Sequence, residues 1–208
     1  MTKNSSDLLG RVSNLKQDDS SRDIYDDWSE DYDEHLRNEF GYISPAVAAA
    51  ELAGNLERRD LEIIDYGCGT GLVGEALHEQ GFVNIDGADI SDGMLEQARA
   101  KQVYRRLLCA DLTARIPLDD ASYEAGLCVG SMGAGHVAAQ HVPEMLRPIQ
   151  QGGLFVIIMN GTYFCSGGFE QAFQKMQDDG LWSIQKLEEF NYMTRLVRPG
   201  WLLLASKL

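Results

Sequence analysis

The sequence predicts an α/β protein with a seven-stranded, mostly parallel sheet, helices on both faces and an antiparallel hairpin at the C-terminal end. Apolar runs of strand length alternate with helical stretches through most of the chain, which is typical of parallel βαβ units. Near the end, two β-rich runs, 182–190 and 201–206, are joined by a segment containing Pro199-Gly200 that is too short for a crossover helix. We therefore expect these two runs to pair antiparallel at one edge of the sheet.

The chain divides into a polar start and one folded domain. Residues 1–19 are polar and without periodicity, so we expect a disordered tail. The rest, 20–208, has the size of a single domain. Within it we expect an N-terminal helical cap, 20–57, followed by the sheet-forming core, 58–208.

The predicted cap begins with a helix that has an aromatic stripe and an acidic surface. Spacings of three and four residues place one set of side chains on a single stripe: Ile24, Tyr25, Trp28, Tyr32, His35 and Leu36. Acidic residues occupy most of the other positions, either as a solvated face or as a rim that favours a cationic substrate. A second helix should begin at Ser44, an N-cap followed by Pro45, and end at Gly54.

The predicted core alternates strands and helices before it reaches the hairpin. The expected strands are 61–66, 83–88, 103–109, 123–129 and 154–159. One helix should follow the first strand and end at about Glu79, and another should run from Ser91 to Lys101.

Composition excludes several classes of protein. Lys and Arg number 18 against 32 Asp and Glu, and the resulting net charge of −14 disfavours a nucleic-acid partner. The longest apolar run, 154–159, is far shorter than the ~20 residues of a membrane span, and the first residues lack the apolar segment of a signal peptide. The four cysteines form no C-x-x-C pair, so no metal site is expected. These features predict a cytoplasmic protein and leave its oligomeric state open.

A strand that runs into a glycine-rich turn and then a helix is the most informative segment. It reads Ile63-Ile64-Asp65-Tyr66-Gly67-Cys68-Gly69-Thr70-Gly71-Leu72-Val73-Gly74. Glycines allow a tight turn and a close approach to a ligand, and the start of the helix presents free N–H groups. Gly69, Gly71 and Gly74 also fit the dinucleotide pattern G-x-G-x-x-G, which is weak evidence by itself. The segment indicates a nucleotide-like cofactor at the carboxyl ends of the strands.

Asp65 helps to choose between cofactors. It is a carboxylate within an otherwise apolar strand, and its burial is costly unless a cation or a hydrogen-bond donor meets it. A dinucleotide has no cationic group for that place, whereas S-adenosylmethionine carries an ammonium and a sulfonium. The carboxylate therefore favours S-adenosylmethionine.

The same segment matches a family motif. The stretch Asp65–Gly71 fits (D/E)-x-G-x-G-x-G at every fixed position, and on this basis the chain resembles the class I S-adenosylmethionine-dependent methyltransferases over about residues 20–208. The resemblance implies a Rossmann-like fold, S-adenosylmethionine as cofactor and S-adenosylhomocysteine as product. Within the class, Tyr25-Asp26-Asp27-Trp28-Ser29-Glu30-Asp31-Tyr32-Asp33 and Gly135-His136-Val137 are most similar to the Williams–Beuren syndrome chromosome region methyltransferase-like proteins.

The resemblance also implies which residues hold the ribose and methionine parts of the cofactor. The motif places Gly67, Cys68, Gly69, Thr70 and Gly71 against it. A second site is Asp89, 20 residues after Gly69, where a carboxylate can accept hydrogen bonds from both ribose hydroxyls. The backbone of Val129 and Gly130, at the end of the fourth strand, should lie beside the methionine part.

Two further segments match the family's adenine contacts. Asp89-Ile90-Ser91-Asp92-Gly93-Met94-Leu95 resembles D-x-S-x-x-M-L, which implies that Ile90 and Met94 flank the adenine ring. Ala110-Asp111-Leu112 is similar to A-D-hydrophobe, which implies that Asp111 receives the adenine amino group and the Leu112 N–H meets a ring nitrogen. Without these motifs, Met94 would be read as core packing and Asp111 as the cap of a turn.

The residues expected near the methyl acceptor match fewer motifs. His136 is a candidate general base or substrate contact, with a hydrogen-bonded or solvent-facing histidine as the alternative. Tyr25 and Trp28 either close over the cofactor or only pack in the core. Methyl transfer needs mainly alignment and desolvation, and a base matters only when the acceptor arrives protonated. The sequence therefore does not name the acceptor.

Several functions remain open at this stage. Residues 130–133 lack the (N/D)-P-P-aromatic motif of nucleic-acid amino methyltransferases, which favours a small-molecule acceptor, or else a protein side chain. A non-catalytic S-adenosylmethionine-binding module that acts through a partner is the alternative from another class. A nicotinamide-dependent dehydrogenase is disfavoured, because the chain has no room for a second domain or a Tyr/Lys set.

Overall fold

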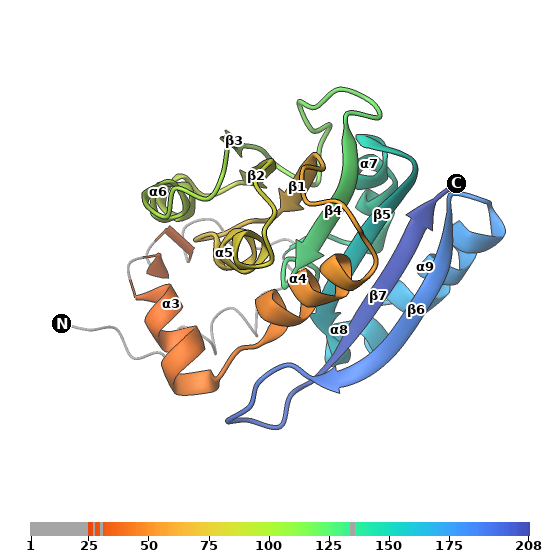
Figure 1. Ribbon diagram of the computed structural model, residues 1–208. Helices are drawn as coiled ribbons and strands as arrows, with labels where there is room; N and C mark the ends of the chain where they lie inside the picture. Colours follow the sequence, from red (N-terminus) through yellow and green to blue (C-terminus); the bar gives the residue numbers. More distant parts are fainter. Residues whose placement is uncertain (1–24, 27, 30, 134–135) are drawn as a thin grey trace.

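The computed structural model describes residues 25–26, 28–29, 31–133 and 136–208 (Figure 1). The predicted tail, 1–19, and Ile24 of the aromatic stripe lie outside the described residues. The helical elements are α3 (Tyr32–Glu34), η1 (His35–Phe40), α4 (Ser44–Gly54), α5 (Leu72–Glu79), α6 (Asp92–Ala100), η2 (Ala139–His141), α7 (Val142–Leu146), α8 (Gly161–Ser166) and α9 (Phe169–Asp178). The strands are β1 (Ile63–Tyr66), β2 (Ile85–Asp89), β3 (Arg106–Cys109), β4 (Tyr123–Val129), β5 (Ile149–Asn160), β6 (Trp182–Asn191) and β7 (Pro199–Lys207).

Seven strands form one sheet in the order β3-β2-β1-β4-β5-β7-β6. The pairs from β3 to β5 are parallel, whereas β7 is antiparallel to both β5 and β6. This arrangement confirms the predicted fold class, including the C-terminal hairpin (Figure 1). Strand order reverses between β1 and β4, so the ends of these two strands open a crevice where a parallel α/β sheet binds its ligand.

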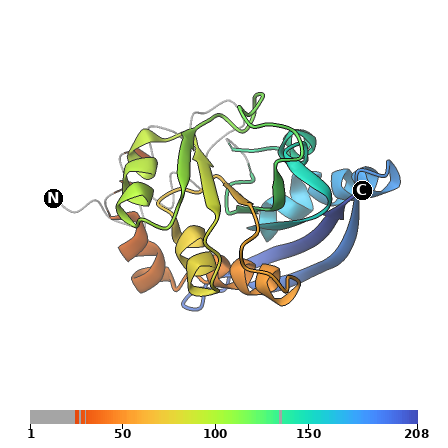
Figure 2. The ribbon, with the colours of Figure 1, turned by 45° about the horizontal axis from the view of Figure 1, so that its top comes forward.

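Alternating side chains of the central strands build two cores, one on each face of the sheet. Ile64 and Phe155 belong to the cluster that α7, α8 and α9 cover. Ile63 and Val156, their neighbours in sequence, belong to the cluster that α4 and α5 cover. Successive residues of a strand point to opposite faces, so a strand buried on both sides reads as a continuous apolar run. Figure 2 shows these helices on the two sides of the sheet.

The N-terminal cap differs from the single helix that the spacing predicts. Tyr25, Asp26 and Trp28 have helical backbone, a turn follows, and the helix resumes as α3 and continues as the π-helical η1. In a π-helix, residues five apart share a face, so His35 and Phe40 are both buried. Phe40 packs in a small cluster with Leu72 of α5. The cap therefore keeps Trp28, His35 and Leu36 of the predicted stripe buried, although its backbone is not one continuous α-helix.

The second cap helix is found within one residue of its prediction. Ser44 is the first residue of α4 rather than its N-cap, a position that Ile43 occupies, and Pro45 lies in the first turn. Within the described ranges, the structure contains no helix of the length and apolarity that a membrane crossing requires.

Candidate functional site

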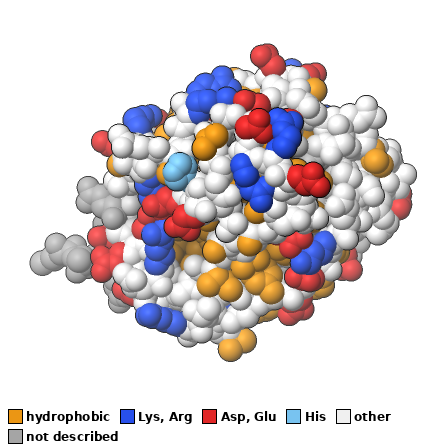
Figure 3. Space-filling model, in the orientation of Figure 1, with side chains coloured by type: hydrophobic (Ala, Val, Ile, Leu, Met, Phe, Trp, Pro, Cys, Tyr) orange, Lys and Arg blue, Asp and Glu red, His pale blue; other side chains and the backbone are white. Residues whose placement is uncertain are grey.

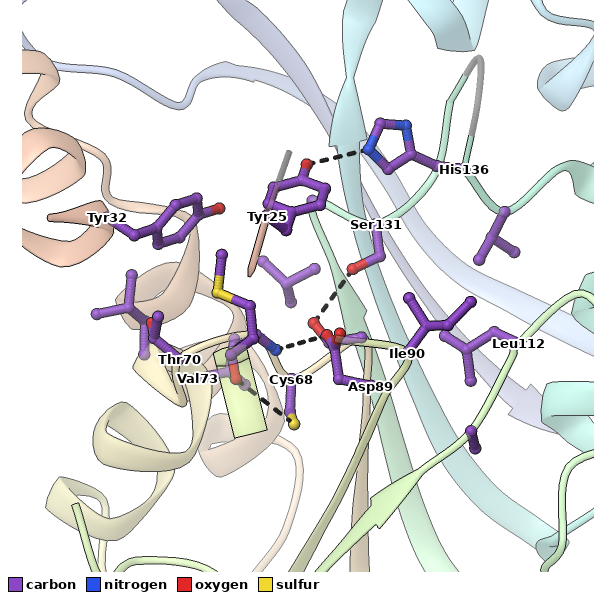
Figure 4. A pocket seen from close by; sticks show the side chains of 18 of the residues that line it. Tyr25, Tyr32, Cys68, Thr70, Val73, Asp89, Ile90, Leu112, Ser131 and His136 are labelled. Atoms are coloured by element: carbon purple, nitrogen blue, oxygen red, sulfur yellow. Dashed lines mark hydrogen bonds between the residues drawn. The ribbon is translucent and has the colours of Figure 1, made fainter. Parts of the chain in front are cut away.

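A cavity of about 370 Å³ opens at the carboxyl ends of β1, β2 and β4, beneath the N-terminal cap (Figure 4). Its size lies within the range of small-molecule and cofactor sites. The described residues that line it are Tyr25, Tyr32, Tyr42, Pro45, Gly67, Cys68, Gly69, Thr70, Leu72, Val73, Asp89, Ile90, Met94, Ala110, Asp111, Leu112, Thr113, Val129, Gly130, Ser131, His136 and Val137.

The glycine turn after β1 forms the floor of this cavity. Gly67 and Gly69 have φ angles of 66° and 53°, a region that favours glycine. A Cβ at Gly69 would meet no protein atom within 4 Å, so the space above this residue is open. At Gly67, by contrast, a Cβ would collide with the Ser131 side chain, whose hydroxyl donates to the Gly67 carbonyl at 3.2 Å. The turn therefore contacts the end of β4 at Gly67, whereas its backbone at Gly69 is open to a ligand.

Asp89 ties the end of β2 to this turn. Its Oδ2 accepts a hydrogen bond of 2.8 Å from the Gly69 N–H, and its Oδ1 accepts one of 2.9 Å from the Ser91 N–H. Burial raises the pKa of this carboxyl, against the effect of these backbone donors. Each carboxylate oxygen has two acceptor positions, so Asp89 can also accept from a diol in the cavity.

The side of the cavity beyond Asp89 combines apolar walls with one exposed acid. Ile90 lines it, and so does Met94, which is 2% exposed. Oδ1 of Asp111 accepts from the backbone N–H and the hydroxyl of Thr113, at 2.8 and 2.7 Å. Asp111 thus caps a turn and also lines the cavity. Its role as a turn cap is therefore compatible with the expected contact to adenine.

Asp65 lies beneath the glycine turn and does not line the cavity. It has no exposed surface, and its Oδ2 accepts a 2.7 Å hydrogen bond from the Tyr104 hydroxyl. No described protein atom donates a hydrogen bond to its other oxygen, Oδ1. Burial raises the pKa of this carboxyl to about 7. Gly71, also predicted to contact the cofactor, is likewise outside the lining, since its Cβ position faces the ring of Tyr104.

Three tyrosines of the cap wall the cavity opposite the glycine turn. Tyr25, Tyr32 and Tyr42 line it, and burial raises the pKa of each phenol. Trp28 does not reach it. Its ring packs edge-on against Tyr32, with centroids 4.8 Å apart, and its Nε1–H donates to Nδ1 of His35 at 2.8 Å.

His136 lies at the rim of the cavity, across from the glycine turn. Its Nε2 and the Tyr25 hydroxyl are hydrogen bonded at 3.0 Å, as Figure 4 shows. The same two residues line a second cavity of about 120 Å³ on the side away from Asp89. Trp28 lines this second cavity only.

The structure thus gathers thirteen of the sixteen predicted site residues around one cavity, with Trp28, Asp65 and Gly71 outside its lining. Sequence reasoning missed Tyr42 and Pro45, which come from cap positions that carry no motif, and Leu72, Val73 and Thr113, which directly follow the matched motifs. Ser131 was identifiable, because it directly follows Gly130 at the end of β4. Tyr32 was visible as part of the aromatic stripe, though not as a cavity wall.

The comparisons with known proteins agree with this geometry. A family model described as "Methyltransferase domain" matches residues 63–153. The human protein Methyltransferase-like protein 27 is 33% identical over 166 residues, which cover 76% of this chain and 66% of that protein. The 18S rRNA (guanine-N(7))-methyltransferase of Bos taurus is 30% identical over 84 residues, 40% of this chain and 30% of that protein. The chain therefore spans less than two thirds of the length of these curated relatives.

A solved structure shows the same fold. Geranyl diphosphate C-methyltransferase from Streptomyces coelicolor A3(2), crystallised with Mg²⁺, geranyl-S-thiolodiphosphate and S-adenosyl-L-homocysteine, superposes with a TM-score of 0.59 at 16% identity. The match covers 78% of this chain and 76% of the Streptomyces chain.

Residues 63–153 thus match a methyltransferase domain, and the predicted resemblance to the class I S-adenosylmethionine-dependent methyltransferases is confirmed. The predicted resemblance to the Williams–Beuren region methyltransferase-like proteins is confirmed by the human relative, and the predicted cofactor by the family.

Proposed function

We propose that the chain transfers a methyl group from S-adenosylmethionine, held in the large cavity, to a small-molecule acceptor held beside His136. One observation carries this proposal: the large cavity adjoins a smaller one across a shared wall that contains Tyr25 and His136. A donor and an acceptor in these two places would meet at that wall, and holding reactants together supplies up to roughly 7–11 kcal/mol of a barrier.

The residues present fit the cofactor. The open space over Gly69 admits a ligand against the backbone, and the buried Asp89 carboxylate lines the cavity with acceptor positions to spare. In this proposal Asp89 holds the ribose hydroxyls, while Ile90, Met94, Asp111 and Leu112 surround the adenine. When bound, the cofactor supplies a methyl group already activated on a sulfonium.

The protein's own task is to align the acceptor, exclude water and move a proton where the acceptor carries one. The Tyr25 hydroxyl and the His136 imidazole are hydrogen bonded at the shared wall, so a proton released there can pass to this pair. We propose His136 as its final base. The described part of the cap supplies Tyr25, Tyr32 and Tyr42 to the cavity wall, and these rings would exclude water from the reacting groups.

A small molecule is favoured over RNA as the acceptor. The bovine relative is named as an rRNA methyltransferase, so RNA is the competing acceptor that an experiment must include. The net charge of −14 opposes a phosphate backbone. On the face in Figure 3, Lys and Arg side chains lie among Asp and Glu side chains and form no continuous basic field. A protein side chain remains the alternative acceptor.

Two measurements test the proposal. Calorimetry should show saturable binding of S-adenosylmethionine and S-adenosylhomocysteine and no binding of NAD. Production of S-adenosylhomocysteine should then depend on an added metabolite fraction and not on 18S rRNA. Cofactor binding without turnover on any metabolite, protein or RNA fraction would instead indicate a non-catalytic binding module.

A further inference from the structure

We propose that the smaller cavity is the acceptor subsite and that it selects a compact amine, positively charged both before and after methylation. This inference rests on the proposed function, because it assigns the chemistry of that reaction's acceptor. It is carried by the position of the cavity, the chemistry of its walls and the arrangement of its aromatic rings.

The position of the smaller cavity suits an acceptor. It shares Tyr25, Tyr32, Tyr42, Gly130 and His136 with the large cavity, so the two spaces meet along one wall. A nucleophile in the smaller cavity would therefore lie next to a cofactor bound in the large one, as direct methyl transfer requires.

The walls of the smaller cavity suit a cation and not an anion. Among the described residues that line it, none is Lys, Arg, Asp or Glu. A phosphate or carboxylate there would lose its hydration with no cationic partner, which costs several kcal/mol. Trp28, Tyr163, Tyr192 and three methionines line it in addition to the shared tyrosines. The faces of aromatic rings carry partial negative charge and attract a desolvated cation.

The rings around this cavity stand nearly perpendicular to one another. Tyr42 and Tyr192 have centroids 6.0 Å apart with an interplanar angle of 88°, and Trp28 and Tyr32 are 4.8 Å apart at 74°. Tyr25 and Tyr32 are 6.1 Å apart at 70°. Perpendicular rings enclose a space from several directions, whereas stacked rings would cover one side only. Such an enclosure matches a compact, rounded ammonium group better than a flat base.

Groups that line the two cavities can account for the proton and the electron pairs of this reaction. An ammonium in the smaller cavity loses one proton to the pair formed by Tyr25 and His136, and the nitrogen thereby gains a free lone pair. That lone pair forms the new N–C bond as the C–S bond breaks, and the bonding electrons remain on sulfur. The methylated nitrogen carries the positive charge again, and His136 later releases its proton to water.

A matched series of probes tests the selection directly. Benzylamine, benzyl alcohol and benzoate share one ring and differ in charge at pH 7. We expect benzylamine to bind the complex with S-adenosylhomocysteine at least tenfold more tightly than benzyl alcohol, with no measurable binding of benzoate. Mass spectrometry should then show N-methylbenzylamine, or a methylated homologue from a wider amine panel, when S-adenosylmethionine is supplied.

Tyr163 provides the matched variants, because it lines the smaller cavity and not the large one. Tyr163→Phe keeps the aromatic face and should bind benzylamine within about twofold of the wild type. Tyr163→Leu removes the face and should weaken binding about tenfold, between the effects of exposed and fully desolvated cation–π contacts. Both variants should bind S-adenosylhomocysteine as the wild type does.

Several outcomes would contradict the proposal that the smaller cavity selects a cationic amine. Equal binding of benzylamine and benzyl alcohol, measurable binding of benzoate, or equal effects of the two Tyr163 variants would each contradict it. The absence of binding by every amine, with S-adenosylhomocysteine still bound, would also reject the subsite. Loss of S-adenosylhomocysteine binding itself, by contrast, would count against the proposed function.

Discussion

The Tyr104 hydroxyl donates a 2.7 Å hydrogen bond to Oδ2 of Asp65 beneath the glycine turn, and it accepts one of 3.1 Å from the Gly74 N–H. A Cβ at Gly71 or Gly74 would lie within 3 Å of the Tyr104 ring. These two glycines therefore make room for a tyrosine of the protein itself. Asp65 and Tyr104 together fix the turn against β2 and α5, which positions Gly69 for a ligand.

Asp65 should make stability depend on pH. Its folded-state pKa of about 7 lies above the ordinary value near 3.9, so the folded protein binds a proton over a range where the unfolded chain does not. The contribution of Asp65 to the free energy of unfolding is therefore fully present below about pH 4, and it is lost as the pH rises to about 7. Relative to Asp65→Asn, the wild type should lose about 2–3 kcal/mol of unfolding free energy between pH 5 and pH 8.

Urea unfolding of the cofactor-free protein measures this difference. Glu96→Gln, at an exposed acid of α6, is the control and should follow the wild-type curve at each pH. If the difference in unfolding free energy between the wild type and Asp65→Asn stayed constant across this pH range, Asp65 would not titrate as the structure implies.

Asp89→Ala should weaken binding of S-adenosylmethionine. The carboxylate offers acceptors to two hydroxyls, and hydrogen bonds to a charged group contribute about 1.5–3 kcal/mol. We expect roughly a 10- to 150-fold increase in Kd by calorimetry. Glu96→Gln, on the neighbouring helix but outside the cavity lining, should leave Kd unchanged. An unaltered affinity of the Asp89 variant would remove this residue from the cofactor site.

Gly69→Val should abolish cofactor binding while leaving a folded protein. A side chain at Gly69 projects into open space and costs about 1–2 kcal/mol of backbone strain at its φ of 53°. Gly152 is a matched control, because its φ is 78° and its Cβ position also meets no atom within 4 Å, yet it lies outside the cavity lining. Gly152→Val should lose similar stability in thermal unfolding and keep its affinity for S-adenosylhomocysteine. Similar affinities for the two variants would mean that Gly69 does not face the ligand.

Removal of residues 1–36 should leave the sheet folded and weaken cofactor binding. The two large cores lie outside this segment, whereas Tyr25 and Tyr32 line the cavity. Beyond the small cluster that contains Leu36, the segment is held by polar contacts, including the ion pair from Lys101 to Asp33 and a 3.1 Å hydrogen bond from the Gly93 N–H to Asp26. Such an attachment opens more readily than a packed core.

Hydrogen exchange distinguishes a lid from fixed packing. We expect low amide protection between residues 25 and 36 without ligand and a gain on adding S-adenosylhomocysteine. High protection without ligand, together with global unfolding of the truncated chain, would identify the segment as part of the core.

His136→Gln should lower kcat and leave cofactor affinity within about twofold. General bases contribute about 100- to 10,000-fold in rate, and the effect should be largest for acceptors that arrive protonated. His141→Gln is the control: its Nδ1 accepts from the Ala138 N–H at 3.1 Å, and it lines neither cavity. An unchanged kcat and pH profile for His136→Gln would exclude a proton-transfer role.

The sequence by itself determined the order of the strands, the antiparallel hairpin and the glycine turn, because each depends on short-range patterns of apolar residues, glycine and proline. It did not predict α7, α8 or α9 individually. It also placed Asp89 and Asp111 correctly at strand ends, where a local motif reports a local geometry. Only the tertiary structure decided which long-range neighbours meet. It set Tyr104 under the turn, broke the predicted cap helix at the turn before α3, and placed Trp28 against the ring of Tyr32. Such contacts join residues far apart in the chain, and their packing depends on the shape of the surface that each segment meets, which no local spacing encodes.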